Sequence, residues 1–247
     1  MAKDGFRPLR KPKEALVWPF SAIRHAKDFD VNMKLGPGEP LAGPWRVTPI
    51  RGLVRLLFDA ARVRDGRPWI LAVDGRSGSG KSTVAALLQR SVPASAIVHT
   101  DDVAWHHSFF DWSDLLVEGI LKPLRNGRAV SYRPPGWDKR GRPGAIEVAA
   151  GLDLVIVEGV GASGTEVMPW IDCALWVQSD LEEAERRGIA RDGGTQGARD
   201  FWREWGAQEF DFLQRQRPWE RATVIVNGTP TQPYDQSTEI MLAPALY

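Results

Sequence analysis

A glycine-rich segment constrains the fold of this 247-residue chain more than any other feature of its sequence. The segment is Gly75-Arg76-Ser77-Gly78-Ser79-Gly80-Lys81-Ser82. The apolar run Trp69–Asp74 directly before it predicts a strand, and the stretch Ser82–Ser91 directly after it predicts a helix. The spacing Gly-x4-Gly-Lys-Ser in this context predicts a P-loop, in which a buried strand is joined to a helix N-terminus.

The residue types in this loop suit the binding of nucleotide phosphates. Because Gly78 and Gly80 carry no side chain, backbone N–H groups can curl around a phosphate, and the helix N-terminus adds partial positive charge. Lys81 supplies a charge for the β- and γ-phosphate oxygens, and the hydroxyl of Ser82 can bind Mg²⁺. We therefore predict that the nucleotide is held by Gly75, Ser77, Gly78, Ser79, Gly80, Lys81, Ser82 and Thr83.

Short apolar runs separated by helical patterns indicate the fold class. The runs are Trp69–Asp74, Ala96–Thr100, Leu154–Glu158, Ala174–Gln178 and Thr223–Val226. Each is apolar throughout rather than alternating, which is typical of strands buried on both faces of a parallel sheet. Helices are predicted from about residue 53 to Ala61 and over Ser82–Ser91, Ser113–Asn126, Leu181–Arg191 and Arg199–Arg215. We expect an α/β protein of three layers, with a five-stranded parallel sheet and helices on both faces.

The chain divides into two parts by composition. Residues 1–48 contain many prolines and glycines, which disfavour long elements, and we expect an extended or disordered arm there. Trp18, Phe20 and Trp45 are the residues through which such an arm would dock. Residues 49–247 carry the regular pattern and form one domain.

Composition excludes several classes of function. Lys and Arg total 32 against 31 Asp and Glu, so no net field attracts a nucleic acid or a membrane surface. No run of about 18 apolar residues is present, so no membrane span is expected. Cys173 is the single cysteine and lies in an apolar run, which predicts a buried thiol in a cytoplasmic protein.

Further motifs follow the P-loop along the chain. They are His99-Thr100-Asp101-Asp102 at a strand end, Leu154–Gly159 ending in Glu-Gly, Glu185–Asp192 in a charged helix, and Ala222–Gly228 in the last strand. Together with Ala72–Thr83 they resemble the uridine kinase family of P-loop small-molecule kinases, near the nicotinamide riboside and pantothenate kinases. The resemblance covers about residues 68–228 and implies the strand order 2-3-1-4-5, with ATP and Mg²⁺ bound at the P-loop.

The resemblance also implies the catalytic carboxylates. Asp101 corresponds to the general base that receives the proton of the acceptor hydroxyl, and Asp102 would lie beside it, toward Mg²⁺ or the substrate. Glu158, at the end of another strand, would help to hold Mg²⁺ or order the acceptor, so that Ser82, Asp101 and Glu158 form the metal site. Ligands do bind beyond the carboxyl ends of strands in open α/β sheets. Which of the two aspartates is the base stays open.

A lid near residues 181–200 is the next implication of the resemblance. Arg187 and Arg191 would close over the phosphates and act with Lys81 on the transferring phosphoryl group. Gly188 stands where the family usually has a second arginine, and Arg186 is a candidate substitute. An exposed, ion-paired helix face is the alternative interpretation of this segment.

The acceptor side departs most from the family pattern. The stretch from Ser131 to Gly144 falls where the family has a substrate-binding hairpin, and Tyr132, Arg133, Trp137 and Asp138 are its candidate contacts. A proline-rich surface loop is the alternative. His106, His107, Phe109, Phe110 and Trp112 either touch the acceptor or belong to the core or the solvated surface.

The sequence therefore predicts an ATP- and Mg²⁺-dependent kinase that phosphorylates a hydroxyl group of a small molecule, with a nucleoside among the candidates. The alternatives are a P-loop phosphotransferase for a sugar, an antibiotic or a cofactor precursor, and a non-catalytic nucleotide-binding protein. The expected partners are ATP and the small acceptor, with neither nucleic acid nor membrane. The choice of ATP over GTP, the acceptor itself and assembly into a homo-oligomer are open.

Overall fold

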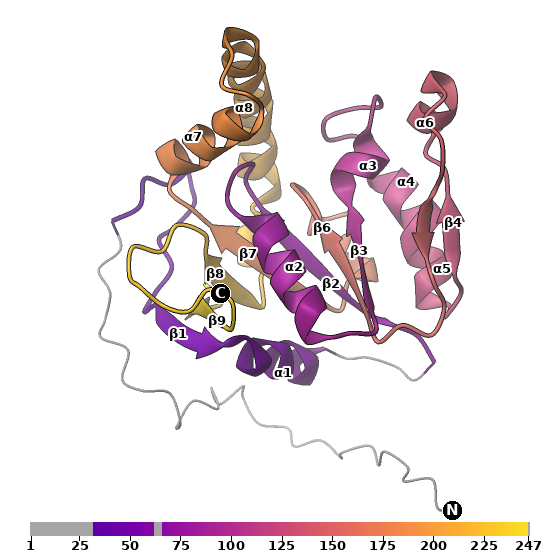
Figure 1. Cartoon of the computed structure of the whole chain (residues 1–247), viewed down its shortest axis with the longest axis horizontal. Helices are drawn as coiled ribbons and strands as arrows, with labels where there is room; N and C mark the ends of the chain where they lie inside the picture. The colour runs from indigo at the N-terminus through magenta and orange to yellow at the C-terminus, as the bar shows by residue number, and fades with distance from the viewer. Residues whose placement is uncertain (1–31, 62–65, 247) are drawn as a thin grey trace, which may run out of the picture.

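A computed structural model describes residues 32–61 and 66–246 of the chain (Figure 1). Trp18 and Phe20 lie outside these residues. The main sheet has the strand order β1-β9-β8-β7-β2-β6-β3. Its strands are β1 (Arg46–Pro49), β2 (Trp69–Gly75), β3 (Ser95–His99), β6 (Leu154–Glu158), β7 (Cys173–Gln178), β8 (Val224–Asn227) and β9 (Glu239–Pro244).

The parallel part of the sheet agrees with the sequence prediction. Strands β3, β6, β2, β7 and β8 pair in parallel, which is the order 2-3-1-4-5 for the five predicted runs. The sheet is wider than predicted, because β9 pairs antiparallel with β8 and β1 pairs antiparallel with β9. Strand β9 was not among the predicted apolar runs. Strand β1 was missed because it lies in the proline-rich region, and Pro49 is tolerated there at the end of an edge strand.

Helices cover both faces of the sheet. They are α1 (Ile50–Ala60), α2 (Lys81–Ser91), α3 (Thr100–Ala104), α4 (Ser113–Leu116), α5 (Lys122–Arg125), α6 (Pro135–Arg140), α7 (Leu181–Arg191) and α8 (Gln196–Gln216), with single turns η1 (Val117–Leu121), η2 (Met168–Trp170) and η3 (Pro218–Glu220). A separate hairpin pairs β4 (Val130–Tyr132) with β5 (Ile146–Val148), and the segment that connects these two strands contains α6.

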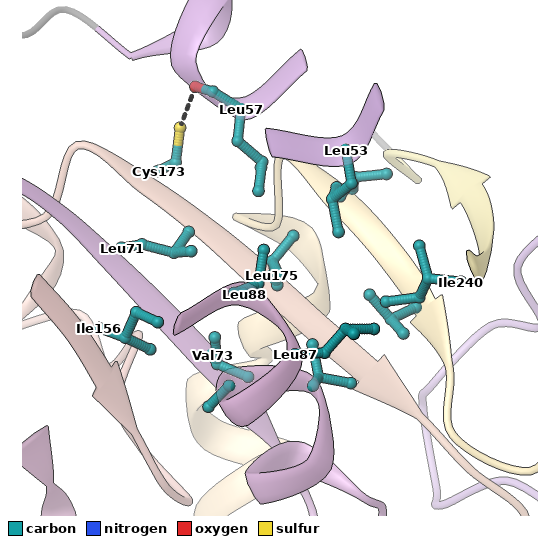
Figure 2. Close-up of a cluster of buried hydrophobic side chains, with 14 of the residues drawn as sticks. Leu53, Leu57, Leu71, Val73, Leu87, Leu88, Ile156, Cys173, Leu175 and Ile240 are labelled. Atoms are coloured by element: carbon teal, nitrogen blue, oxygen red, sulfur yellow. Dashed lines mark hydrogen bonds between the residues drawn. The ribbon is translucent and has the colours of Figure 1, made fainter. Parts of the chain in front are cut away.

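The two faces of the sheet belong to different parts of the core because side chains alternate along each strand. Leu71 and Val73 of β2 pack with α1 and α2 in the cluster drawn in Figure 2. Ile70 and Ala72 point to the other face and pack with α4, η1 and α5. Beside them, β7, β8 and β9 are covered by α8, η3 and the residues before β1. Cys173 is buried, as expected, and its thiol donates to the Leu57 carbonyl.

Local sequence signals explain several helix boundaries. Asp180 caps α7 by accepting the Glu183 N–H at 3.0 Å, and Thr195 caps α8 by accepting the Ala198 N–H at 3.2 Å. The predicted helix Ser113–Asn126 is present as α4, η1 and α5, of which η1 is a π turn. One residue, Lys122, separates this turn from Pro123, which has no N–H to donate to an α-helical hydrogen bond.

Within the described residues, no helix has both the length and the apolar character needed to cross a membrane.

Shortening a buried side chain of the central strand tests the importance of this packing. Leu175 of β7 is fully buried between β2 and β8. We expect Leu175→Ala to lower the free energy of unfolding by about 2–5 kcal/mol, since it leaves a cavity in a close-packed core. Urea unfolding followed by circular dichroism measures this change. Leu41→Ala, at a half-exposed side chain, is the control and should change stability by less than ~0.5 kcal/mol.

Candidate active site

A cavity of about 510 Å³ lies at the carboxyl ends of the parallel strands. The P-loop, α3 and the loop after it, the end of β6, α7 and α8 form its walls. In Figure 1, α7 and α8 rise on one side of this edge of the sheet, and α3 and α6 on the other. The predicted site residues that line the cavity are Ser77, Gly78, Gly80, Lys81, Ser82, Thr83, Asp101, Glu158, Arg187 and Arg191. Gly75 and Ser79 belong to the same loop but are buried and do not line the cavity.

The P-loop is packed tightly against α7. Gly78 has a φ of +73°, and a Cβ atom there would lie 2.0 Å from the carbonyl oxygen of Ala184 in α7. Any larger residue would therefore push α7 away from the loop. Lys81 is almost fully buried, and its Nζ donates to the Arg76 carbonyl at 2.9 Å. The lysine is thereby held across the mouth of the loop, where phosphate oxygens are expected.

A buried carboxylate fixes the start of the P-loop. Asp74 accepts hydrogen bonds from the N–H groups of Gly75 (2.7 Å), Gly161 (3.0 Å) and Ser163 (2.9 Å) and from the Ser163 hydroxyl (2.7 Å). Complete burial raises the pKa of Asp74, although these hydrogen bonds oppose the rise. Asp74 therefore ties the start of the P-loop to the loop that follows Glu158.

Ser82 and Glu158 form an oxygen-rich pair below the P-loop. The Ser82 hydroxyl donates to Glu158 Oε1 at 3.2 Å, and His99 Nδ1 lies 2.7 Å from Glu158 Oε2. Burial pushes the pKa of Glu158 up, but the hydrogen bond from His99 and the charge of Lys81 outweigh it and lower the pKa. The hydrogen bond to Glu158 in turn raises the pKa of His99. Glu158 is therefore held ionised.

The donors present fit Mg²⁺. This ion prefers octahedral oxygen ligands, keeps several waters and is usually bound through one or two carboxylates together with substrate phosphates. The Ser82 hydroxyl and the Glu158 carboxylate are adjacent oxygen donors beside the phosphate loop, and Asp101 lines the same cavity. Within residues 32–61 and 66–246, no group of three or more His, Cys, Asp or Glu side chains could hold a metal alone.

The structure separates the two adjacent aspartates. Asp101 is exposed and lines the cavity. Asp102 lies outside the lining and forms an ion pair with Arg142 at 2.7 Å, while its carbonyl accepts the Trp137 indole N–H at 2.8 Å. The Arg142 guanidinium stacks 3.7 Å from the centre of a Trp137 ring. Of the two carboxylates, that of Asp101 is therefore at the cavity, and that of Asp102 is held by Arg142.

Two arginines of α7, Arg187 and Arg191, line the cavity. Arg187 donates to the Gly228 carbonyl at 2.7 Å and also pairs with Glu183. Arg191 pairs with Asp192 at 2.9 Å, and this hydrogen bond raises the pKa of Arg191. Arg186 is exposed, pairs with Glu183 and does not line the cavity.

Trp202 of α8 explains the glycine at position 188. A Cβ atom on Gly188 would lie 1.6 Å from the Trp202 ring, so this position has no room for an arginine. The Trp202 indole N–H also donates to Asp192 Oδ2 at 2.8 Å. Trp202 therefore joins α7 to α8 at the place where the family pattern has a second positive charge.

Aromatic side chains from α8 and from the loop after α3 form a large part of the cavity wall. They are Trp105, Phe109, Trp112, Phe201, Trp202 and Trp205. Phe109 contacts Trp205 edge-on at a centroid distance of 5.0 Å, and the Trp205 indole N–H donates to the Ser77 hydroxyl at 2.8 Å. The sequence analysis named Phe109, Phe110 and Trp112 as residues that either touch the acceptor or belong to the core or the surface, and it assigned no site role to the aromatic residues of α8. Phe110 packs on Phe212 instead.

The residues predicted to contact the acceptor from the hairpin do not line this cavity. Tyr132 packs next to Gly119, Trp137 is buried, and Arg133 pairs with Asp138 at 2.7 Å. Their assignment as acceptor contacts stays a prediction. Of the two histidines after Trp105, His106 lines the cavity and His107 does not.

Comparisons with known proteins find similarity in structure only. No known family model matches the chain, and no curated protein matches its sequence. Similar solved structures include a possible uridine kinase from Bacillus stearothermophilus, with 17% identity, coverage of 71% of this chain and 96% of that one, and a TM-score of 0.49. A proposed fructose transport system kinase from a Silicibacter species follows, with 17% identity, coverage of 68% and 89%, and a TM-score of 0.47.

A Thermus thermophilus protein matches with 20% identity, coverage of 67% and 91%, and a TM-score of 0.40. The structures that resemble this fold thus include uridine kinase-like and related P-loop kinases, at 12–20% identity among those compared. These values are too low to carry the activities of those proteins over to this chain.

The His99–Glu158 pair predicts a pH-dependent part of the stability. The raised pKa of His99 means that its contribution is complete below the ordinary value of ~6.5 and is lost as pH rises through the folded value. The lowered pKa of Glu158 means that its contribution is present above ~4.3 and is lost as pH falls through the folded value. His99→Gln should therefore destabilise the chain most between about pH 4.5 and 6.5.

The effect should be below ~1 kcal/mol because His99 is half exposed. Urea unfolding at several pH values, in buffer without Mg²⁺, measures it. His107→Gln, at an exposed histidine outside the cavity, is the control. A difference between wild type and His99→Gln that stays constant from pH 5 to pH 9 would contradict the prediction.

Proposed function

We propose that this chain is an ATP- and Mg²⁺-dependent kinase that transfers the γ-phosphate to a hydroxyl group of a small molecule. One observation carries the proposal. The cavity that contains Lys81 and Ser82 of the P-loop is also lined by Asp101, a carboxylate of α3. A passive nucleotide-binding protein needs no base at this position, whereas phosphoryl transfer to an alcohol does.

The proposed step uses residues of this chain for binding, charge and proton transfer. Asp101 accepts the proton of the acceptor hydroxyl as its oxygen attacks the γ-phosphorus. The bond from that phosphorus to the β–γ bridging oxygen breaks, and ADP leaves with the electron pair. Lys81, Arg187 and Arg191 stabilise the negative charge that is shared among the phosphoryl oxygens. When bound, Mg²⁺ would neutralise part of the phosphate charge, and Ser82, Glu158 and Asp101 are the residues that would hold it.

The aromatic side chains that line the cavity favour one kind of acceptor. Its rings offer large, rigid apolar surfaces, against which a flat or ring-shaped molecule is stabilised by burial and stacking. Ser108 and His106 are polar groups on the same side. A nucleoside, or another ring-bearing alcohol such as an antibiotic or cofactor precursor, suits this wall better than an open-chain sugar.

Asp101→Asn tests the assignment of the base. The amide keeps the shape of the side chain but accepts a proton poorly, so kcat should fall by about 10²–10⁴-fold. Asp102→Asn is the matched control, because its carboxylate pairs with Arg142 outside the cavity lining and its loss should cost less than tenfold. The acceptor is first identified by a metabolite screen with ATP and GTP. Phosphoryl transfer is then measured by the release of ADP and by the increase in the mass of the acceptor by one phosphate. Asp101→Asn activity within a few-fold of wild type would contradict the assignment.

Phe109→Leu tests the acceptor wall. The smaller side chain removes stacking surface beside Trp205 but touches no P-loop residue through a hydrogen bond. We expect KM for the acceptor to rise by about 5- to 30-fold, equivalent to ~1–2 kcal/mol, with KM for ATP unchanged. Phe58→Leu, at an exposed phenylalanine of α1, is the control. Equal increases in both KM values would place Phe109 with the nucleotide instead.

A further inference from the structure

Residues 33–45, here called the strap, lie directly before β1 and belong to the folded core. Met33, Ala42 and Trp45 of the strap are buried in one cluster with Trp176 and Trp219. The sequence analysis placed these residues in a proline- and glycine-rich arm. The structure brings part of that arm into contact with the P-loop.

The contact is a buried ion pair between Glu39 of the strap and Arg76 of the P-loop. Glu39 Oε2 accepts from Arg76 Nη2 at 2.7 Å, and the two side chains are 0% and 3% exposed. Glu39 Oε1 accepts from the Trp176 indole at 2.7 Å and from Gln178 Nε2 at 3.0 Å. The carboxylate thus holds Arg76 against the end of β7, and a buried charge that loses its partner is strongly destabilised.

The next P-loop residue is held from a different element. Glu209 of α8 is also buried, and its Oε1 accepts the Ser77 N–H at 2.7 Å. The Arg76 guanidinium lies 5.7 Å from the centre of the Phe210 ring, on the same helix. Arg76 and Ser77 are therefore fixed from two sides by side chains outside the phosphate-binding motif.

The backbone of Arg76 connects this residue to the phosphate-binding groups of the P-loop. Its carbonyl accepts hydrogen bonds from Lys81 Nζ at 2.9 Å and from the Ser79 N–H at 3.1 Å. Since the Arg76 side chain is buried, it cannot contact a phosphate in the cavity itself. A shift of Arg76 would move the oxygen that orients Lys81.

The strap also contacts the N-terminal end of α7. The Lys34 N–H donates to Asp180 Oδ2 at 2.8 Å, and the Leu181 N–H donates to the Lys34 carbonyl at 2.9 Å. Asp180 is the N-cap of α7, which carries Arg187 and Arg191. One short segment therefore touches both the phosphate loop and the helix that brings the lid arginines.

We propose that the strap belongs to the nucleotide site and that Glu39 is a positioning residue. By holding Arg76, Glu39 keeps Lys81 and the P-loop in their phosphate-binding arrangement. This inference rests on the proposed function only in that the P-loop binds a nucleoside triphosphate. It predicts that loss of the Glu39 carboxylate weakens nucleotide binding, although Glu39 itself touches no ligand.

The test measures the Kd of MgATP and MgGTP by titration calorimetry with the full-length chain, at a temperature where circular dichroism shows each variant to be folded. Glu39→Gln should raise the Kd of the preferred nucleotide at least tenfold, and Glu39→Asp should raise it less. In steady-state assays, KM for the nucleotide should rise more than kcat falls.

Asp172→Asn is the matched control. Asp172 is a buried carboxylate paired with Arg67 at 2.6 Å, and it precedes β7 at the end of the sheet opposite the cavity. Its loss should lower stability as the loss of Glu39 does but change the Kd by less than twofold. A purely structural role of Glu39 predicts the same result for both variants.

A double variant keeps the inference testable if Glu39→Gln does not fold. Glu39→Gln with Arg76→Met removes both buried charges, so the chain should regain stability while the Kd stays raised. A folded Glu39→Gln or double variant that binds nucleotide within twofold of wild type overturns the inference. A wild-type chain that binds neither nucleotide counts instead against the proposed function and, with it, the inference that rests on it.

Discussion

A phosphate site made of backbone N–H groups depends on one constraint, which is that its glycine-rich loop must keep a single shape. Glycine backbone is conformationally permissive, so the shape has to be imposed by neighbouring groups. In this chain, buried carboxylates do so from different elements. Asp74 holds the start of the loop, Glu39 holds Arg76, and Glu209 holds the Ser77 N–H. Each of them accepts hydrogen bonds from several donors, which offsets the cost of burying its charge.

The same constraint connects the loop to the rest of the cavity. The loop after Glu158 is tied to the start of the P-loop by Asp74, and α7 lies close enough to Gly78 to exclude a side chain there. The metal-binding carboxylate and the lid arginines that we propose are therefore placed relative to the phosphates by packing against the loop itself. A displacement of the P-loop would move the whole donor half of the site.

The part of the cavity that we propose for the acceptor is built differently. It consists mainly of aromatic surfaces from α8 and from the loop after α3. In the hairpin, Arg133 pairs with Asp138, and Arg142 pairs with Asp102 of α3. Trp202 occupies the space of a second lid arginine and joins α7 to α8. Rigid apolar walls select by shape more than by hydrogen bonds, so we expect ring shape rather than polar substituents to decide which alcohol enters.

The sequence by itself determined the parallel core and the position of the phosphate loop. The five apolar runs and the Gly-x4-Gly-Lys-Ser spacing are local patterns, and local patterns are sufficient to identify buried strands and a phosphate loop. Only the tertiary structure decided which of Asp101 and Asp102 faces the cavity, that Glu39 meets Arg76 across 37 residues, and that Trp202 lies on Gly188. These relations depend on side-chain packing between elements distant in the chain, and no periodicity or spacing along the sequence encodes such contacts.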